Sequence, residues 1–95
     1  MNEKTVTYSV IVPVYNRPGE VAELLASLLS QTSKDFEVVI VEDGSTVPCG
    51  DIVREYAAKG LNARYFSKEN EGRSIARNYG LERAVGRYFI FFDSD

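Results

Sequence analysis

Two carboxylates stand two residues apart near the end of the printed sequence, in the tripeptide Asp93-Ser94-Asp95. They follow an unbroken apolar run from Tyr88 to Phe92, which is typical of a strand buried on both faces of a parallel sheet. In an extended chain residues i and i+2 point to the same side, so Asp93 and Asp95 can converge on one ligand. Carboxylate oxygens suit Mn²⁺ or Mg²⁺, and such ions also hold diphosphate oxygens. Taken alone the tripeptide is weak, because Asp-Ser-Asp also forms turns and helix caps.

Two other polar clusters occupy equivalent positions after apolar, β-branched runs. Asp43-Gly44-Ser45 follows the run 36–41, and Tyr15-Asn16 closes the run that begins at Tyr8. Each could be an ordinary turn. However, the carboxyl ends of parallel strands meet at one edge of a sheet, where open α/β sheets bind their ligands. Three polar clusters at this edge favour a ligand site over three unrelated turns.

Strand and helix patterns alternate along the whole chain. Strands are predicted at 8–15, 36–41, 61–67 and 87–92, and helices at 18–31, 51–58 and 73–85. This order predicts an α/β fold, a Rossmann-like parallel sheet of four strands with three helices distributed over both faces and right-handed crossovers.

The last predicted helix carries a ridge of small residues. Ala76, Gly80 and Ala84 fall at i, i+4 and i+8. A glycine inside a helix costs about 1 kcal/mol relative to alanine, so close packing of this helix on the sheet is the expected reason for Gly80. Gly86 is predicted to end the helix.

Composition excludes several classes of function. The formal net charge of −3 argues against a nucleic-acid partner, and the absence of histidine excludes a His-based nucleophilic relay or a His-ligated zinc site. Cys49 is the single cysteine, which fits a reducing compartment, and we expect its thiol to have no chemical role. The polar N-terminus and the lack of a long apolar stretch predict a cytoplasmic chain without a membrane span, although the parent protein could act at the inner face of the membrane.

Other nucleotide-binding classes fit less well. The chain has no Gly-x-Gly-x-x-Gly after its first strand and no P-loop. A metal-dependent nucleotidyltransferase would need a basic or glycine-rich loop there, whereas 15–19 contains one basic residue. A receiver-like signalling domain would need an aspartate at the end of the third strand, where the sequence is Phe66-Ser67-Lys68. Both alternatives stay open.

Nearly the whole chain resembles the N-terminal, nucleotide-sugar-binding part of family 2 glycosyltransferases, which have the GT-A fold. The resemblance rests on several segments in order and at family-like spacing: Ser9–Asn16, Leu28–Thr32, Phe36–Ser45, Asn70–Gly80 and the Asp-x-Asp motif at Asp93 and Asp95.

This resemblance implies a role for several residues in binding a nucleoside diphosphate-sugar donor. Pro13, Val14 and Tyr15 would line the base pocket, with Tyr15 packed against the base or ribose. Asp43 would accept a hydrogen bond from the base. Because members of the family commonly use UDP-sugars, the resemblance favours UDP as the nucleotide. Glu42 stands where many members have Asp, which leaves its role open.

The diphosphate side of the donor site is implied in the same way. Asp93 would face the ribose or a metal-bound water, and Asp95 would ligate the Mn²⁺ or Mg²⁺ ion that bridges the diphosphate. Arg73 and Arg77 are the nearest basic residues; we expect Arg77 to buttress the acidic edge rather than to contact phosphate.

The resemblance also implies what residues 1–95 lack. They would form a GT-A domain truncated at the metal motif, without the general base and the acceptor-binding region. The parent protein would transfer the sugar with inversion to a saccharide or lipid-linked acceptor, in polysaccharide, cell-wall or capsule synthesis, and this chain alone would be inactive. The exposed strand at 87–93 predicts self-association by edge pairing or domain swapping.

Overall fold

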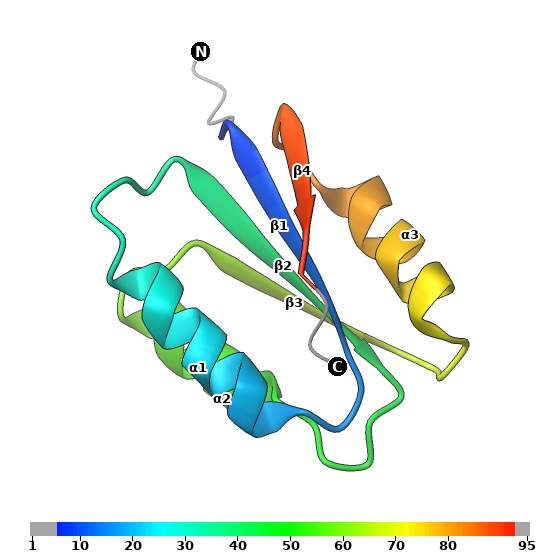
Figure 1. Ribbon diagram of the computed structural model, residues 1–95. Coiled ribbons are helices and arrows are strands. Elements are labelled where there is room, and N and C mark those ends of the chain that lie inside the picture. Colours follow the sequence, from blue (N-terminus) through cyan, green and yellow to red (C-terminus); the bar gives the residue numbers. More distant parts are fainter. Residues whose placement is uncertain (1–5, 93–95) are drawn as a thin grey trace.

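Strands and helices alternate along the chain in the predicted order (Figure 1). This computed structural model describes residues 6–92. The elements are β1 (Tyr8–Val14), α1 (Pro18–Leu29), β2 (Phe36–Asp43), α2 (Gly50–Ala58), β3 (Ala63–Lys68), α3 (Arg73–Arg83) and β4 (Tyr88–Phe91). No helix in this range combines the length and apolar character needed to cross a membrane.

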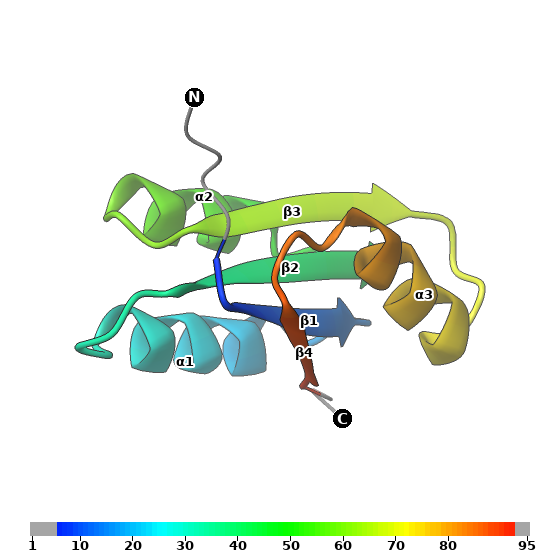
Figure 2. The same ribbon diagram turned by 90° about the horizontal axis from the view of Figure 1, so that it is seen from above.

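All four strands are parallel and lie in the order β3-β2-β1-β4, which confirms the predicted Rossmann-like sheet. The chain first moves outward from β1 to β3 and then crosses back to place β4 on the other side of β1. With right-handed crossovers, this reversal puts α1 and α2 on one face and α3 on the other, as Figure 1 shows. The strand order reverses between β1 and β4, and ligands bind outside the carboxyl ends of the strands at such a point. Figure 2 shows the arrowheads of β1, β2 and β3 at one edge.

Each face of the sheet has its own apolar core, because successive strand residues point to opposite sides. On the face of α1 and α2, the even-numbered residues of β1 and β2 pack with helix residues such as Val21, Leu25 and Val53. On the other face, Ile11, Val39 and Val41 pack against Ala76 of α3.

The small-residue ridge of α3 lies against the sheet as predicted. A Cβ atom at Gly80 would stand 2.8 Å from Ile11 Cγ2 and 3.1 Å from Val41 Cγ2, so the helix could not approach as closely with any larger residue. The predicted end of this helix was wrong. The helix stops at Arg83 rather than at 85. Gly86 instead lets the backbone between α3 and β4 approach β1 closely, since a Cβ there would lie 2.6 Å from Ser9 Oγ.

A buried carboxylate, Glu37 of β2, explains why the helix ends early. It accepts hydrogen bonds from Ser9 Oγ at 2.6 Å, from the Val85 backbone N–H at 2.7 Å and from the Arg64 guanidinium at 2.7 Å. Arg64 also donates to the Arg83 carbonyl at 2.6 Å. These contacts satisfy backbone groups that a longer helix would use, and they fix the connection that leads into β4.

Strand β4 is an exposed edge strand, as predicted, although an apolar run of this kind is typical of a strand buried on both faces. Its side chains and that of Phe92 are 42–58% exposed. The reason is its position, because β4 pairs with β1 along one edge and no described strand pairs with its other edge.

We predict that stability at acidic pH depends on Glu37. Burial raises the pKa of Glu37, but hydrogen bonds from Ser9, the Val85 N–H and Arg64 outweigh burial and hold it below the ordinary 4.5. The folded protein therefore binds fewer protons than the unfolded chain between the two pKa values, and stability falls as pH drops from about 4.5 through the folded-state pKa. Urea unfolding from pH 7 to pH 3 should show this loss.

The variant Glu37→Gln isolates this contribution. It should lower the free energy of unfolding by about 1–3 kcal/mol at pH 7, because one charged acceptor is lost from a buried set of donors, and its stability should vary less with pH than that of the wild type. The same exchange at exposed Glu55 of α2 is the matched control. Identical pH slopes for Glu37→Gln and wild type would contradict the assignment.

Candidate functional site

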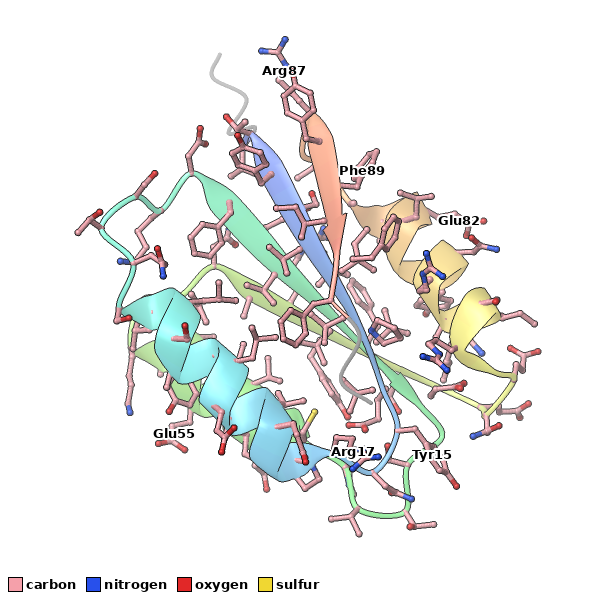
Figure 3. All side chains as sticks on the ribbon, viewed as in Figure 1. Tyr15, Arg17, Glu55, Glu82, Arg87 and Phe89 are labelled. Atoms are coloured by element: carbon pink, nitrogen blue, oxygen red, sulfur yellow. The ribbon has the colours of Figure 1, made fainter. Side chains whose placement is uncertain are left out.

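The candidate site lies at the carboxyl edge of the sheet, where the loops after β1, β2 and β3 meet. In Figure 3, Tyr15 and Arg17 lie at this end of the sheet, and Arg87 lies at the opposite end. The loop after β1 contacts the loop after β2 through Asn16, and the loop after β2 contacts the loop after β3 through Asp43 and Gly44. The structure thus brings together two of the three predicted polar clusters, Tyr15-Asn16 and Asp43-Gly44-Ser45.

Asp43, predicted to bind the base, is buried at 5% exposure and holds the start of α3. Its Oδ1 accepts the Glu71 N–H at 2.9 Å, and its Oδ2 accepts the Gly72 N–H at 3.1 Å. Lys68 Nζ lies 3.9 Å from Oδ1. Because each carboxylate oxygen has two lone pairs, Asp43 can accept a further hydrogen bond from a ligand while it keeps these contacts.

Gly44 allows the loops after β2 and β3 to touch. Its φ of +72° is in the left-handed region. A Cβ atom at this position would also lie 2.5 Å from the backbone nitrogen of Asn70. Asn70 Nδ2 in turn donates to the Asp43 carbonyl at 3.0 Å. A side chain at 44 would therefore separate the loops that surround Asp43.

Glu42 is an organising residue whose role the sequence left open. It is 1% exposed, and its Oε1 accepts the Cys49 N–H and the Tyr65 hydroxyl, each at 2.8 Å. Its Oε2 accepts the Ser45 hydroxyl. The burial of Glu42 was not predictable from its residue type; the only hint was its place directly after the apolar run Val38–Val41.

The turn after β1 is fastened to the turn after β2 by Asn16. Asn16 has a φ of +55°, and its N–H donates to Ser45 Oγ at 2.8 Å. Its Oδ1 accepts the backbone N–H groups of Thr46 and Val47, each at 2.9 Å. These contacts fix the backbone on both sides of Tyr15 relative to β2.

The three residues predicted to line a base pocket differ in accessibility. Tyr15 is 47% exposed, so its ring is available to a ligand. Val14 packs into the core formed with α1 and α2. Pro13 is buried but lines a cavity of about 170 Å³ together with Arg77, Phe91 and Phe92.

The two predicted arginines are exposed on α3. Arg73 is its first residue, directly after the two N–H groups that Asp43 holds. The Arg77 guanidinium lies 4.6 Å from the centre of the Phe91 ring, a cation–π contact with β4. Arg77 thus braces the helix against β4, beside the cavity that Pro13 lines.

Cys49 is not in a surface loop, as its sequence context suggested, but is buried at the start of α2. Burial, reinforced by the negative charge of Glu42, raises the pKa of its thiol to about 12. The thiol therefore stays protonated at neutral pH.

The predicted metal ligands, Asp93 and Asp95, lie outside the described residues. Phe92 still donates its N–H to the Ile11 carbonyl at 2.9 Å, so the pairing of the last strand with β1 continues to this residue. Within residues 6–92, no group of three or more His, Cys, Asp or Glu side chains is arranged to hold a metal ion.

Solved structures of known proteins share this arrangement. The crystal structure of S. aureus TarS 1–349 in complex with UDP-GlcNAc is 40% identical, with a TM-score of 0.85 over 95% of this chain and 27% of that chain. The mannosyltransferase PcManGT from Pyrobaculum calidifontis, in complex with GDP-Man and Mn²⁺, is 29% identical, with a TM-score of 0.84 over 100% of this chain and 30% of that chain.

Sequence comparison leads to the same group of proteins. An uncharacterized glycosyltransferase of Rickettsia felis is 46% identical over 87 residues, which are 92% of this chain and 14% of that protein. The chain therefore spans only a small part of the relatives that it matches. The family model described as glycosyl transferase family 2 matches residues 9–95, and this chain belongs to that family.

Proposed function

We propose that the protein containing this chain transfers a sugar from a nucleoside diphosphate-sugar, specifically a UDP-sugar, to a hydroxyl acceptor with inversion. The observation that carries this proposal is the 40% identity and close structural match to TarS, whose structure contains UDP-GlcNAc. The carboxyl-edge site supports it, because three loops meet there around a buried aspartate. Residues 1–95 would be the donor-binding part.

The base would bind between the turn after β1 and Asp43. The exposed ring of Tyr15 offers a surface for the base or ribose, and the free lone pairs of Asp43 can accept the uracil N3–H. Pro13 and Val14 would contribute their backbone and the rigidity of β1, since both are buried.

The diphosphate would lie toward β4. Asp95 would ligate Mn²⁺ or Mg²⁺, and Asp93 would face the ribose or a metal-bound water. A bound divalent cation stabilises the negative charge that builds on the leaving nucleoside diphosphate. Arg73 stands at the start of α3, next to the residues that Asp43 holds, and is the arginine that we assign to phosphate, whereas the contact of Arg77 with Phe91 favours the bracing role.

The acceptor side lies outside this chain in our proposal. General base catalysis needs a carboxylate within hydrogen-bond reach of the acceptor hydroxyl. The buried acids Glu37, Glu42 and Asp43 each accept several hydrogen bonds within the protein. We therefore expect residues 1–95 to bind the nucleoside diphosphate-sugar without transferring its sugar. We assign the complete reaction to the cytoplasmic side, with a saccharide or lipid-linked acceptor.

Calorimetric titration with UDP tests the donor site. The chain should bind UDP more tightly with Mn²⁺ than without it, and Asp95→Ala should weaken the Mn²⁺-dependent binding by at least about ten-fold, because one metal ligand is lost. Asp51→Ala is the matched control, since it removes the same charge from an exposed position of α2. An equal UDP affinity of Asp95→Ala and wild type in the presence of Mn²⁺ would contradict the metal assignment. Absence of UDP binding would contradict a donor site formed by these residues.

Tyr15 tests the position of the base. Tyr15→Ala should weaken UDP binding roughly ten-fold through lost stacking, which contributes about 1–3 kcal/mol per base in comparable sites. Tyr15→Phe should retain most of the affinity, and both variants should keep the wild-type melting temperature because the side chain is half-exposed. Equal affinities for Tyr15→Ala and wild type would place the base elsewhere.

We also propose that this chain pairs with a second copy of itself along β4. The apolar side chains of this strand are exposed and its outer edge offers backbone groups to another strand. Sedimentation velocity should show a concentration-dependent dimer, and Ile90→Lys should shift it to monomer. Ile75→Lys, at an exposed position of α3, is the matched control. A wild-type monomer at high concentration would reject this pairing.

A further inference from the structure

Glu42 is a charged group in an interior position, and its contacts reach three separate elements. Its two oxygens accept donors from the start of α2 (Cys49 N–H), from β3 (Tyr65 hydroxyl) and from the turn after β2 (Ser45 hydroxyl). A buried carboxylate is stable only when such donors replace water. The position of Cys49 at the start of α2 adds the favourable helix dipole.

Ser45 extends this set of contacts to the turn after β1. The Ser45 hydroxyl donates its proton to Glu42, which leaves the lone pairs of its oxygen free to accept. This oxygen accepts a hydrogen bond from the Asn16 N–H at 2.8 Å. Asn16 adopts a left-handed backbone conformation, which asparagine tolerates better than most residues other than glycine. The side-chain oxygen of Asn16 then binds Thr46 and Val47.

The outcome is a continuous chain of hydrogen bonds from the interior to the candidate base site. It runs from Glu42 through Ser45 to Asn16, the residue that directly follows Tyr15. Glu42 itself is 1% exposed and its carboxylate faces Cys49 and Tyr65, so it is not open to solvent at the edge.

We propose that Glu42 is a positioning residue for donor binding, which acts through Ser45 and Asn16 to hold the turn carrying Tyr15 in the geometry that receives the nucleotide base. This inference rests on the proposed function, because it concerns how the same site achieves its affinity for UDP.

The chemistry of the side chain makes the inference testable. Glutamine has the same shape but a single acceptor oxygen, and its amide nitrogen can meet Ser45 only as a donor. Glu42→Gln therefore removes the acceptor of the Ser45 hydroxyl proton and can at most reverse that hydrogen bond. Ser45→Ala is more selective, because it leaves the contacts of Glu42 with Cys49 and Tyr65 in place and removes only the Ser45 hydroxyl, which bonds both Glu42 and Asn16. If Glu42→Gln fails to fold, Ser45→Ala still decides the question.

The experiment measures UDP affinity by calorimetry in the presence of Mn²⁺ for wild type, Glu42→Gln and Ser45→Ala. Both variants should bind UDP about ten-fold more weakly, the loss expected when one or two hydrogen bonds that order a binding turn are removed. Amide hydrogen exchange at Thr46 and Val47 should become about ten-fold faster in both variants, while exchange within β1 and β2 stays slow.

Glu37→Gln is the matched control for loss of stability. It changes a buried glutamate on the same strand to the same amide, but Glu37 contacts Ser9, Arg64 and Val85 and has no link to Asn16. It should lower the melting temperature and leave the UDP affinity within two-fold of wild type. A similar affinity loss in Glu37→Gln would show that general destabilisation, not positioning, weakens binding, and would overturn the inference.

Two further results would also overturn it. The first is UDP affinity within two-fold of wild type for both Glu42→Gln and Ser45→Ala. The second is unchanged amide exchange at Thr46 and Val47 in both variants, which shows that Glu42 does not order the turn. A wild-type protein that binds no UDP would contradict the proposed function. The exchange measurement needs no ligand, so it tests this inference separately from the proposed function.

Discussion

A carboxylate remains charged inside a protein only where hydrogen-bond donors surround it, and three such groups on β2 organise both ends of this sheet. Glu37 collects donors at the amino end of the strands, and Glu42 and Asp43 collect them at the carboxyl end. Several of these donors are backbone N–H groups of loops and helix starts, which would otherwise lack partners. The acids of the central strand thereby determine where the loops lie.

The alternation of side chains along a strand explains why two acids stand next to each other. Even-numbered residues of β2 face α1 and α2, and odd-numbered residues face α3. Glu42 therefore receives donors from the start of α2 and from Tyr65, and Asp43 receives donors from the residues before α3. A single acid could organise the loops of one face only. The pair allows loops from both faces to meet at one edge.

Much of the fold could be predicted from the sequence because its signals are local. Apolar periodicity located every strand and helix, and the alternating order implied a parallel sheet with its polar clusters at one edge. The ridge at Gly80 was also predictable, since a glycine inside a helix needs a packing reason. By contrast, the end of α3 depends on Glu37 and Arg64, which are distant in sequence, and no local pattern reveals that contact. The exposure of β4 was predicted from its place at the edge of the sheet, whereas its apolar composition alone would suggest burial.

The candidate site shows the same division between local and distant causes. The residues that could contact a nucleoside diphosphate-sugar, such as Tyr15 and Asp43, were identified from their places at strand ends. The contacts that hold them in position came only from the structure, because Glu42, Ser45 and Asn16 join two loops that are about thirty residues apart in the sequence. An aspartate in place of Glu42 would be one methylene shorter, so the distances from the strand to Cys49, Tyr65 and Ser45 would have to contract for it to reach the same donors. The length of this side chain and the spacing of the surrounding loops must therefore match each other, which is the expected consequence when one buried carboxylate connects β3, α2 and the turn after β2.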